Sequence, residues 1–216
     1  MQKHKFTYYF TLIVLSVLIY DTDAYAQQRF SAGPRLGVNL SKYVGNNIVS
    51  NESIAGLSAG AFLMYSSLNH FGISADLLYA QKGAKYIGVG PGGTNVVQRV
   101  NYLEIPVALR YFLTRSGDFR PNLFVGPALG FKLTANQKVE GTDVKTDISD
   151  GVKPIDLGLM AGFQLNFRGL GPRQRFLIDG RYTYGLSGIS AVSGNAHNSV
   201  FTLALGYGFG VGPASR

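Results

Sequence analysis

The chain has 216 residues, of which 46% are hydrophobic and 15% are charged, with no cysteine and a formal net charge of +8. A soluble domain usually has about 25% charged residues, so this composition disfavours a water-exposed globule. The lack of cysteine excludes disulfides and thiolate metal ligands. Because the basic residues form no dense run and no basic helix, we expect contacts with anionic lipid headgroups and no nucleic-acid partner.

The first 26 residues have the three parts of a secretory signal. Lys3 and Lys5 precede an apolar stretch, residues 6–20, and Ala24-Tyr25-Ala26 gives a small-x-small cleavage pattern. A transmembrane anchor is the alternative, but the apolar stretch is short for one and the cleavage pattern follows it closely. We therefore predict a signal peptide over residues 1–26 and a single mature domain over residues 27–216.

Eight later segments alternate between apolar and small or polar residues, a period of two that is typical of β-strands. In each segment one face is apolar, and the other is mainly Gly, Ala, Ser and Thr with a few charges. No later segment approaches 18 continuous apolar residues, so we expect no later transmembrane helix. The predicted strands are residues 30–41, 55–66, 71–82, 97–113, 121–135, 154–167, 175–186 and 199–209.

The fourth segment shows the pattern most clearly. Its opposite face carries Tyr102, Glu104, Pro106, Ala108 and Arg110. The segment is long enough to cross a bilayer, which takes about 9–11 residues. Since a proline lacks a backbone N–H, we expect a local bulge or kink at Pro106. The apolar face carries Leu103, Ile105, Val107, Leu109, Tyr111 and Leu113.

The connections between these strands alternate in length. Short turns are expected at residues 67–69, 116–118 and 169–172, and long polar or glycine-rich loops at residues 42–54, 83–96, 136–153 and 187–198. Short periplasmic turns and long outer loops are typical of a bacterial outer-membrane barrel. We predict an all-β, antiparallel, up-and-down transmembrane barrel of about eight strands, with both termini in the periplasm.

A soluble barrel of the lipocalin kind would also alternate. Its second face would meet water and be rich in Lys, Glu, Asp and Gln. Here that face is small and sparsely charged, and aromatics lie toward the strand ends of the apolar face, as in interfacial girdles. The membrane barrel is therefore the favoured interpretation.

The charges on the small-residue face would lie inside the barrel. We expect them to form a structural network that fills the lumen, since eight strands leave a bore just wide enough for side chains and buried charges must pair. The alternative is a path for protons or ions. We predict that Glu104 pairs with Arg181, Arg110 or Arg35. The inward charges are Arg35, Asp76, Glu104, Arg110, Lys132, Asp156, Asp179 and Arg181.

Three other features have both a functional interpretation and a simpler, non-functional one. His70 and the run His197-Asn198-Ser199 lack an evident carboxylate partner, so we predict no catalytic residues and no enzyme. Residues 88–93, GVGPGG, match the letters of a dinucleotide fingerprint, but no helix is predicted after them. The loop acids Glu140, Asp143, Asp147 and Asp150 could bind a cation, but their spacing matches no calcium loop. We predict no metal and no cofactor.

The chain resembles the PorT-like outer-membrane β-barrel family of Bacteroidetes. The resemblance is carried, in order, by residues 33–37 (GPRLG) with Asn39, residues 76–83 (DLLYAQKG), residues 102–106 (YLEIP), Gly126-Pro127, and residues 181–186 (RYTYGL). It covers most of the chain after the signal and implies an eight-stranded barrel and an accessory role in secretion or surface assembly. In one departure from outer-membrane strands that end on an aromatic, seven residues follow Phe209.

Three functions remain open from the sequence. The first is a non-enzymatic outer-membrane protein that is structural or presents its outer loops to a secretion or surface partner. The second is a narrow pore for ions or small solutes, and the third is a lipid-modifying enzyme. The expected partners are outer-membrane lipids, including lipopolysaccharide, and the barrel-insertion machinery during biogenesis.

Overall fold

The computed structural model describes residues 30–211, except for residues 47, 68–69, 115, 143, 172 and 191–195. The predicted signal peptide and its cleavage site lie outside the described residues. Within the described ranges, no helix has the length and apolar character needed to cross a membrane.

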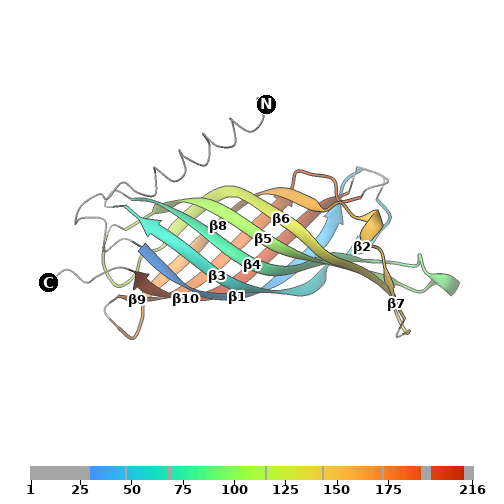
Figure 1. The fold of residues 1–216 in the computed structure, drawn as a ribbon, viewed down its shortest axis with the longest axis horizontal. Coiled ribbons are helices and arrows are strands. Elements are labelled where there is room, and N and C mark those ends of the chain that lie inside the picture. Colours follow the sequence, from blue (N-terminus) through green and yellow to red (C-terminus); the bar gives the residue numbers. More distant parts are fainter. Residues whose placement is uncertain are drawn as a thin grey trace, which may run out of the picture.

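Eight long antiparallel strands form a closed barrel whose strands run obliquely to its long axis (Figure 1). Each long strand pairs with the next one along the chain, and the last pairs with the first. This confirms the predicted all-β up-and-down barrel. The long strands are β1 (Phe30–Val44), β3 (Ile54–Ser66), β4 (Phe71–Tyr86), β5 (Val96–Phe112), β6 (Asn122–Val139), β8 (Ile155–Arg168), β9 (Gln174–Gly185) and β10 (His197–Val211).

The apolar face of each strand points outward. Leu36 on β1 is 64% exposed and Leu109 on β5 is 55% exposed, whereas Glu104 and Arg110 on the other face of β5 are 6% and 1% exposed. Successive side chains of a strand alternate between faces, so the small and charged face is enclosed. The predicted faces of the fourth segment are therefore confirmed.

The two ends of the barrel differ. At one end Phe30 pairs with Val211, and the connections after β3, β5 and β8, residues 67–70, 113–121 and 169–173, turn the chain back; we call this the turn end (left in Figure 1). The other is the loop end, where β2 (Asn51–Glu52) pairs with β4 and β7 (Lys145–Asp147) pairs with β6. Two short 3-10 turns, η1 (Pro91–Gly93) and η2 (Ser149–Gly151), also lie in the loop-end connections.

The irregularity in β5 lies elsewhere than predicted. Pro106 pairs with Ala128, and the register of β5 against β6 is the same on both sides of it, so the predicted bulge is wrong, although the paired residues skip Val107 and Ala108 directly after Pro106. The register shifts instead at Asn101/Tyr102, where Leu133 of β6 has no partner. A missing N–H removes one ladder hydrogen bond but adds no residue to either strand, whereas a bulge needs an extra residue.

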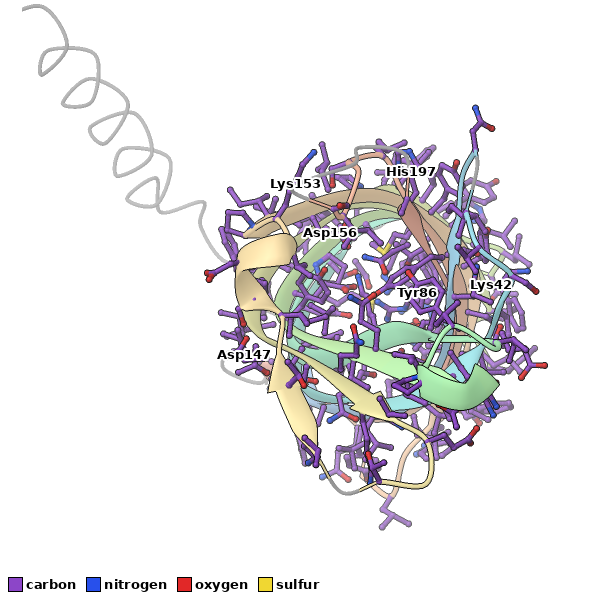
Figure 2. The ribbon with its side chains drawn as sticks, turned by 90° about the vertical axis from the view of Figure 1, so that its right-hand side faces the viewer. Lys42, Tyr86, Asp147, Lys153, Asp156 and His197 are labelled. Atoms are coloured by element: carbon purple, nitrogen blue, oxygen red, sulfur yellow. The ribbon has the colours of Figure 1, made fainter. Side chains whose placement is uncertain are left out.

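Apolar clusters lie at three levels inside the barrel. The loop-end cap contains Tyr43, Ala84, Val100, Tyr102, Ala135, Val152 and Ile189. A turn-end cluster contains Phe62, Met64, Phe112 and Leu177. A third group, Ala108, Phe124 and Met160, lies along β5, β6 and β8. Viewed from the loop end, side chains fill the interior (Figure 2).

Candidate functional site

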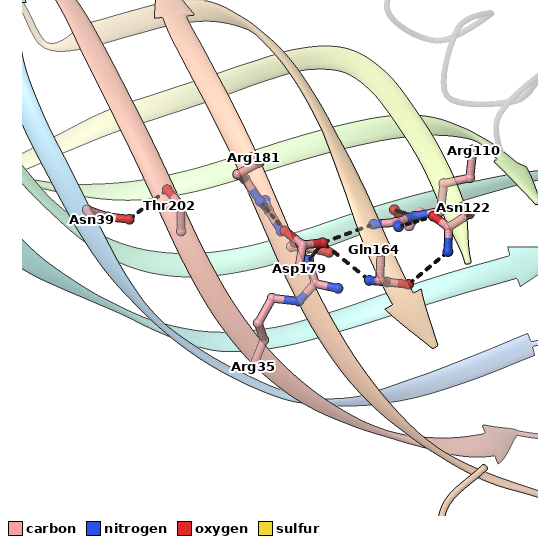
Figure 3. A network of polar contacts seen from close by, with 10 residues as sticks. Arg35, Asn39, Arg110, Asn122, Gln164, Asp179, Arg181 and Thr202 are labelled. Carbon is pink, nitrogen blue, oxygen red and sulfur yellow. Dashed lines mark hydrogen bonds and ion pairs between the residues drawn. The ribbon is translucent and has the colours of Figure 1, made fainter. Parts of the chain in front are cut away.

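The largest polar feature of the lumen is an arginine network of five charged residues from four strands. Figure 3 labels four of its members, Arg35, Arg110, Asp179 and Arg181. Arg35 comes from β1, Asp76 from β4, Arg110 from β5, and Asp179 and Arg181 from β9. All five side chains are at most 3% exposed. Each of the four strands points alternate residues into the lumen, which puts these five side chains on the enclosed face.

Asp179 is the centre of the arginine network. Its carboxylate accepts a hydrogen bond from Arg181 Nε at 2.8 Å and lies 3.4 Å from Arg35 Nη1 and 3.9 Å from Arg110 Nη2. The second carboxylate, Asp76, accepts from Arg35 Nη1 at 2.7 Å and from Arg181 Nη2 at 3.2 Å. Each aspartate therefore pairs with more than one guanidinium. Buried cations need such paired anions to offset the loss of their hydration.

Neutral side chains complete the coordination of Arg110. Its Nε donates to Ser74 Oγ at 2.7 Å and its Nη1 to Asn122 Oδ1 at 2.9 Å. A chain of amides continues from Asn122 through Gln164, whose Nε2 donates to Asp179 at 3.2 Å. The Arg110 guanidinium also lies 4.6 Å from the centre of the Phe124 ring, a cation–π contact.

A second group, the lysine network, contains Lys82, Glu104 and Asp156. Lys82 Nζ lies 2.5 Å from Glu104 and 3.4 Å from Asp156. Asp156 also accepts from Asn198 Nδ2 at 2.8 Å and from Ser187 Oγ at 3.2 Å. Asn198 belongs to β10 and Ser187 to the connection after β9, so the lysine network reaches across the lumen toward the loop end.

The predicted arginine partner of Glu104 is wrong, because the ion pair forms with Lys82. Lys82 lies on the same alternate set of β4 as Asp76, so its inward direction was present in the sequence. The predicted strand ends at Lys82, which makes this side chain look like part of a loop, whereas β4 continues to Tyr86. Relative stagger of the strands decides which cation meets Glu104, and stagger is not a property of any single strand.

Neither network is neutral by itself. The arginine network has three cations and two carboxylates, and the lysine network has one cation and two carboxylates. Their formal charges are thus one positive and one negative, and they cancel across the lumen. A small cavity of about 10 Å³, room for about one water molecule, lies between them and touches Arg181, Lys82 and Glu104.

The loop end of the lumen is closed by packing and by one further inward charge. Lys132 Nζ donates to the carbonyl oxygens of Ser149 and Val152, which draws the loop before β8 onto the barrel. Val152 and Ile189 then pack in the loop-end cap. Lys132 therefore has the predicted inward direction and contacts backbone carbonyls of a loop.

The two described histidines lie at opposite ends of the barrel. His70 Nδ1 lies 2.5 Å from the carbonyl oxygen of Phe112, and its ring stacks on Tyr111. The His197 ring stacks on Tyr184, and its Nδ1 has no hydrogen-bond partner among the residues that the structure describes. The neighbouring Ser199 hydroxyl contacts Tyr182. The side chains of His197 and Ser199 therefore contact different residues, Tyr184 and Tyr182.

The loop acids are engaged in local contacts. Glu140 accepts hydrogen bonds from Asn95 Nδ2 at 2.6 Å and from Lys85 Nζ at 3.1 Å, and these bonds hold its pKa below the usual value. Hydrogen bonds from Ser149 likewise lower the pKa of Asp147. Asp143 lies outside the described residues. Within the described ranges, no group of three or more metal-ligating side chains is present.

The glycine-rich segment at residues 88–93 connects β4 to β5 through η1. A strand, and not a helix, follows it. The helix N-terminus that binds a dinucleotide phosphate in the fingerprint is therefore missing from this connection.

A closed barrel with an apolar exterior and an enclosed polar interior defines the class of membrane-spanning β-barrels. The chain belongs to the family described as outer membrane protein beta-barrel domain, whose model matches residues 25–191. It is therefore a protein of the bacterial outer membrane.

Solved structures similar to this chain share little of its sequence. Neisserial surface protein A is 15% identical over 84% of this chain and 96% of its own, with a TM-score of 0.47. OprG from Pseudomonas aeruginosa is 14% identical over 88% of this chain and 98% of its own, with a TM-score of 0.49. Ail of Yersinia pestis, in complex with the heparin analogue sucrose octasulfate, is 14% identical over 84% of this chain and 99% of its own, with a TM-score of 0.47. A comparison with curated proteins gave no match.

Proposed function

We propose that this protein is a non-enzymatic, non-conducting barrel of the outer membrane that acts through the segments beyond its loop end. The observation that supports the proposal is the filled lumen. The loop-end cap, the two charge networks and the turn-end cluster follow one another along the interior. An ion would have to cross both apolar layers and displace paired charges between them, which is energetically costly.

The proposed orientation puts the turn end in the periplasm and the loop end outside. Short periplasmic turns and longer outer loops are typical of outer-membrane barrels. At the loop end, β2 and β7 widen the sheet formed by β4, β5 and β6 (right in Figure 1). This widened sheet is the surface that we propose for a partner, and the resemblance to PorT-like barrels suggests an accessory role in secretion or surface assembly. Lipopolysaccharide is the expected lipid neighbour there.

Single-channel recording in planar bilayers tests the closed lumen. We expect no steady conductance from the folded protein, with insertion verified by band shift on unheated gels. The matched variant Tyr43→Ser/Tyr102→Ser removes two buried rings from the loop-end cap, and we expect it to show intermittent openings. Steady conductance of the unaltered protein would support the narrow pore instead.

Cysteine labelling in intact cells tests the orientation. The chain has no cysteine, so a single introduced thiol gives an unambiguous signal. We expect a membrane-impermeant maleimide to label Ser50→Cys at the loop end and to leave Ser116→Cys at the turn end unlabelled until the outer membrane is permeabilised. The opposite pattern would reverse the orientation.

A further inference from the structure

The described surface charges are distributed unequally between the two ends. At the turn end the described residues include four arginines, Arg120, Arg168, Arg173 and Arg175, and one acid, Asp118. At the loop end, six described basic residues are accompanied by four described acids: Lys42, Lys85, Arg99, Lys138, Lys145 and Lys153, with Glu52, Glu140, Asp147 and Asp150. Four of the five described charges at the turn end are therefore positive, whereas at the loop end four acids accompany the six basic residues.

Three of these arginines are held close together by the connection between β5 and β6. This connection runs beside the end of β8, because Arg168 N donates to the Asp118 carbonyl and Arg120 N to the Asn166 carbonyl. Arg175 Nη1 donates to the Asp118 carbonyl, and Arg168 Nη1 lies 3.5 Å from the Asp118 carboxylate. Burial, and then the positive charge of Arg175, lower the pKa of Arg120. Asp118 is thus the only described acid beside these three arginines, and its carboxylate contacts Arg168.

The group faces the mouth of the lumen. Arg168 and Arg175 continue the inward alternate sets of β8 and β9, and the Arg120 guanidinium lies 4.6 Å from the centre of the buried Phe112 ring. On the outward set at the same level, Phe119 pairs with Phe167, and both rings are exposed. The aromatic rings therefore occupy the lipid-facing positions, and the guanidinium groups face the aqueous mouth. We call Arg120, Arg168 and Arg175 the arginine mouth.

We propose that the arginine mouth is a docking surface for an acidic polypeptide segment of a periplasmic partner. Arginine binds carboxylates with two parallel hydrogen bonds, and Arg168 presents a side chain that is 59% exposed. The direction of the group, toward the mouth and away from the acyl chains, favours a water-soluble partner over a phospholipid headgroup. The inference rests on the proposed orientation, because it places the partner in the periplasm.

Peptide binding to the full barrel in phosphatidylcholine nanodiscs tests the proposal, since both ends are accessible there. The probe is fluorescein-labelled decaglutamate, with a labelled glycine–serine decapeptide as the neutral control. We expect an anisotropy increase for decaglutamate that falls with added salt. Arg168→Gln/Arg175→Gln should bind about tenfold more weakly. The matched loop-end variant Lys42→Gln/Lys153→Gln removes the same charge and should change the affinity less than about twofold.

A gain of affinity separates recognition from misfolding. Asp118→Asn removes the only described carboxylate near the arginine mouth while its backbone carbonyl contacts remain available. We expect it to bind decaglutamate about threefold more tightly. Absence of binding to the unaltered protein, or an equal loss in the loop-end variant, would overturn the proposal.

Two further results have a defined meaning. In native mass spectra, phosphatidylglycerol could stay bound to the unaltered protein but not to Arg168→Gln/Arg175→Gln. If both proteins also bind decaglutamate equally well, the surface is assigned to lipid and the proposal is overturned. Because the nanodisc measurement has no sidedness, it is independent of the labelling experiment on orientation. Decaglutamate binding with an inverted barrel would therefore disprove the periplasmic partner without disproving the acidic ligand.

Discussion

In the arginine network two aspartates serve three guanidinium groups, whereas in the lysine network one ammonium serves two carboxylates. A guanidinium is planar and presents five donors, so Arg35 and Arg181 can each contact both aspartates from different strands. An ammonium is a compact charge, and Lys82 lies beside the small cavity. The comparison teaches that the arginine network connects four strands across the lumen through shared aspartates. The lysine network, with one excess negative charge, neutralises the excess positive charge of the arginine network.

The largest expected effect comes from removing the centre of the arginine network. Asp179→Asn leaves three buried arginines with one carboxylate, and we expect the free energy of unfolding to fall by about 3–5 kcal/mol. Urea titration of the barrel in lipid vesicles, followed by the band shift on unheated gels, measures it. A loss below about 1 kcal/mol would show that the arginines do not depend on this carboxylate.

The lysine network should respond less, since the cavity beside it can admit water. We expect Lys82→Met to cost about 2–3 kcal/mol because it leaves Glu104 and Asp156 without a cation. The double variant Lys82→Met/Glu104→Gln removes one of the two carboxylate charges and should recover at least half of the loss in the same titration. A double variant as unstable as the single one would contradict the charge explanation.

Outside the lumen, the contact between Glu140, Asn95 and Lys85 should respond to pH. The folded pKa of Glu140 lies below its unfolded value, so this contact contributes at pH above the unfolded value and is lost as pH falls through the folded one. We expect amide exchange protection near β7 and η1, corrected for the intrinsic exchange rate, to decrease as the pH falls below the ordinary range of a glutamate. Glu140→Gln should show no such transition, and a transition that persists in this variant would assign the effect to another group.

The smallest expected effect concerns the exposed ion pair between Asp118 and Arg168. Its partners are 76% and 59% exposed, so solvent screens the pair. We expect Asp118→Asn to change the free energy of unfolding by less than about 0.5 kcal/mol. It is therefore the control for Asp179→Asn, because the same change of residue is made in water and in the lumen. Similar losses from both variants would remove the distinction between buried and exposed carboxylates.

The strands and their faces could be predicted because they depend on a local period. Leu103, Ile105, Val107 and Leu109 lie outward as the alternation requires, and Glu104 and Arg110 lie inward. The predicted inward charges all lie on the enclosed face, from Arg35 in β1 to Arg181 in β9. The bulge could not be predicted, because the extra residue, Leu133, is extra only relative to the neighbouring strand.

The sequence by itself determined an eight-stranded barrel with an apolar exterior and a sparsely charged interior, since a strand sorts its side chains between two faces without reference to any other strand. Only the tertiary structure decided that Glu104 pairs with Lys82 and that Asp179 lies among three arginines. Those pairings join residues as far apart as Arg35 and Asp179, 144 positions along the chain, and they depend on how far each strand is staggered when the sheet closes.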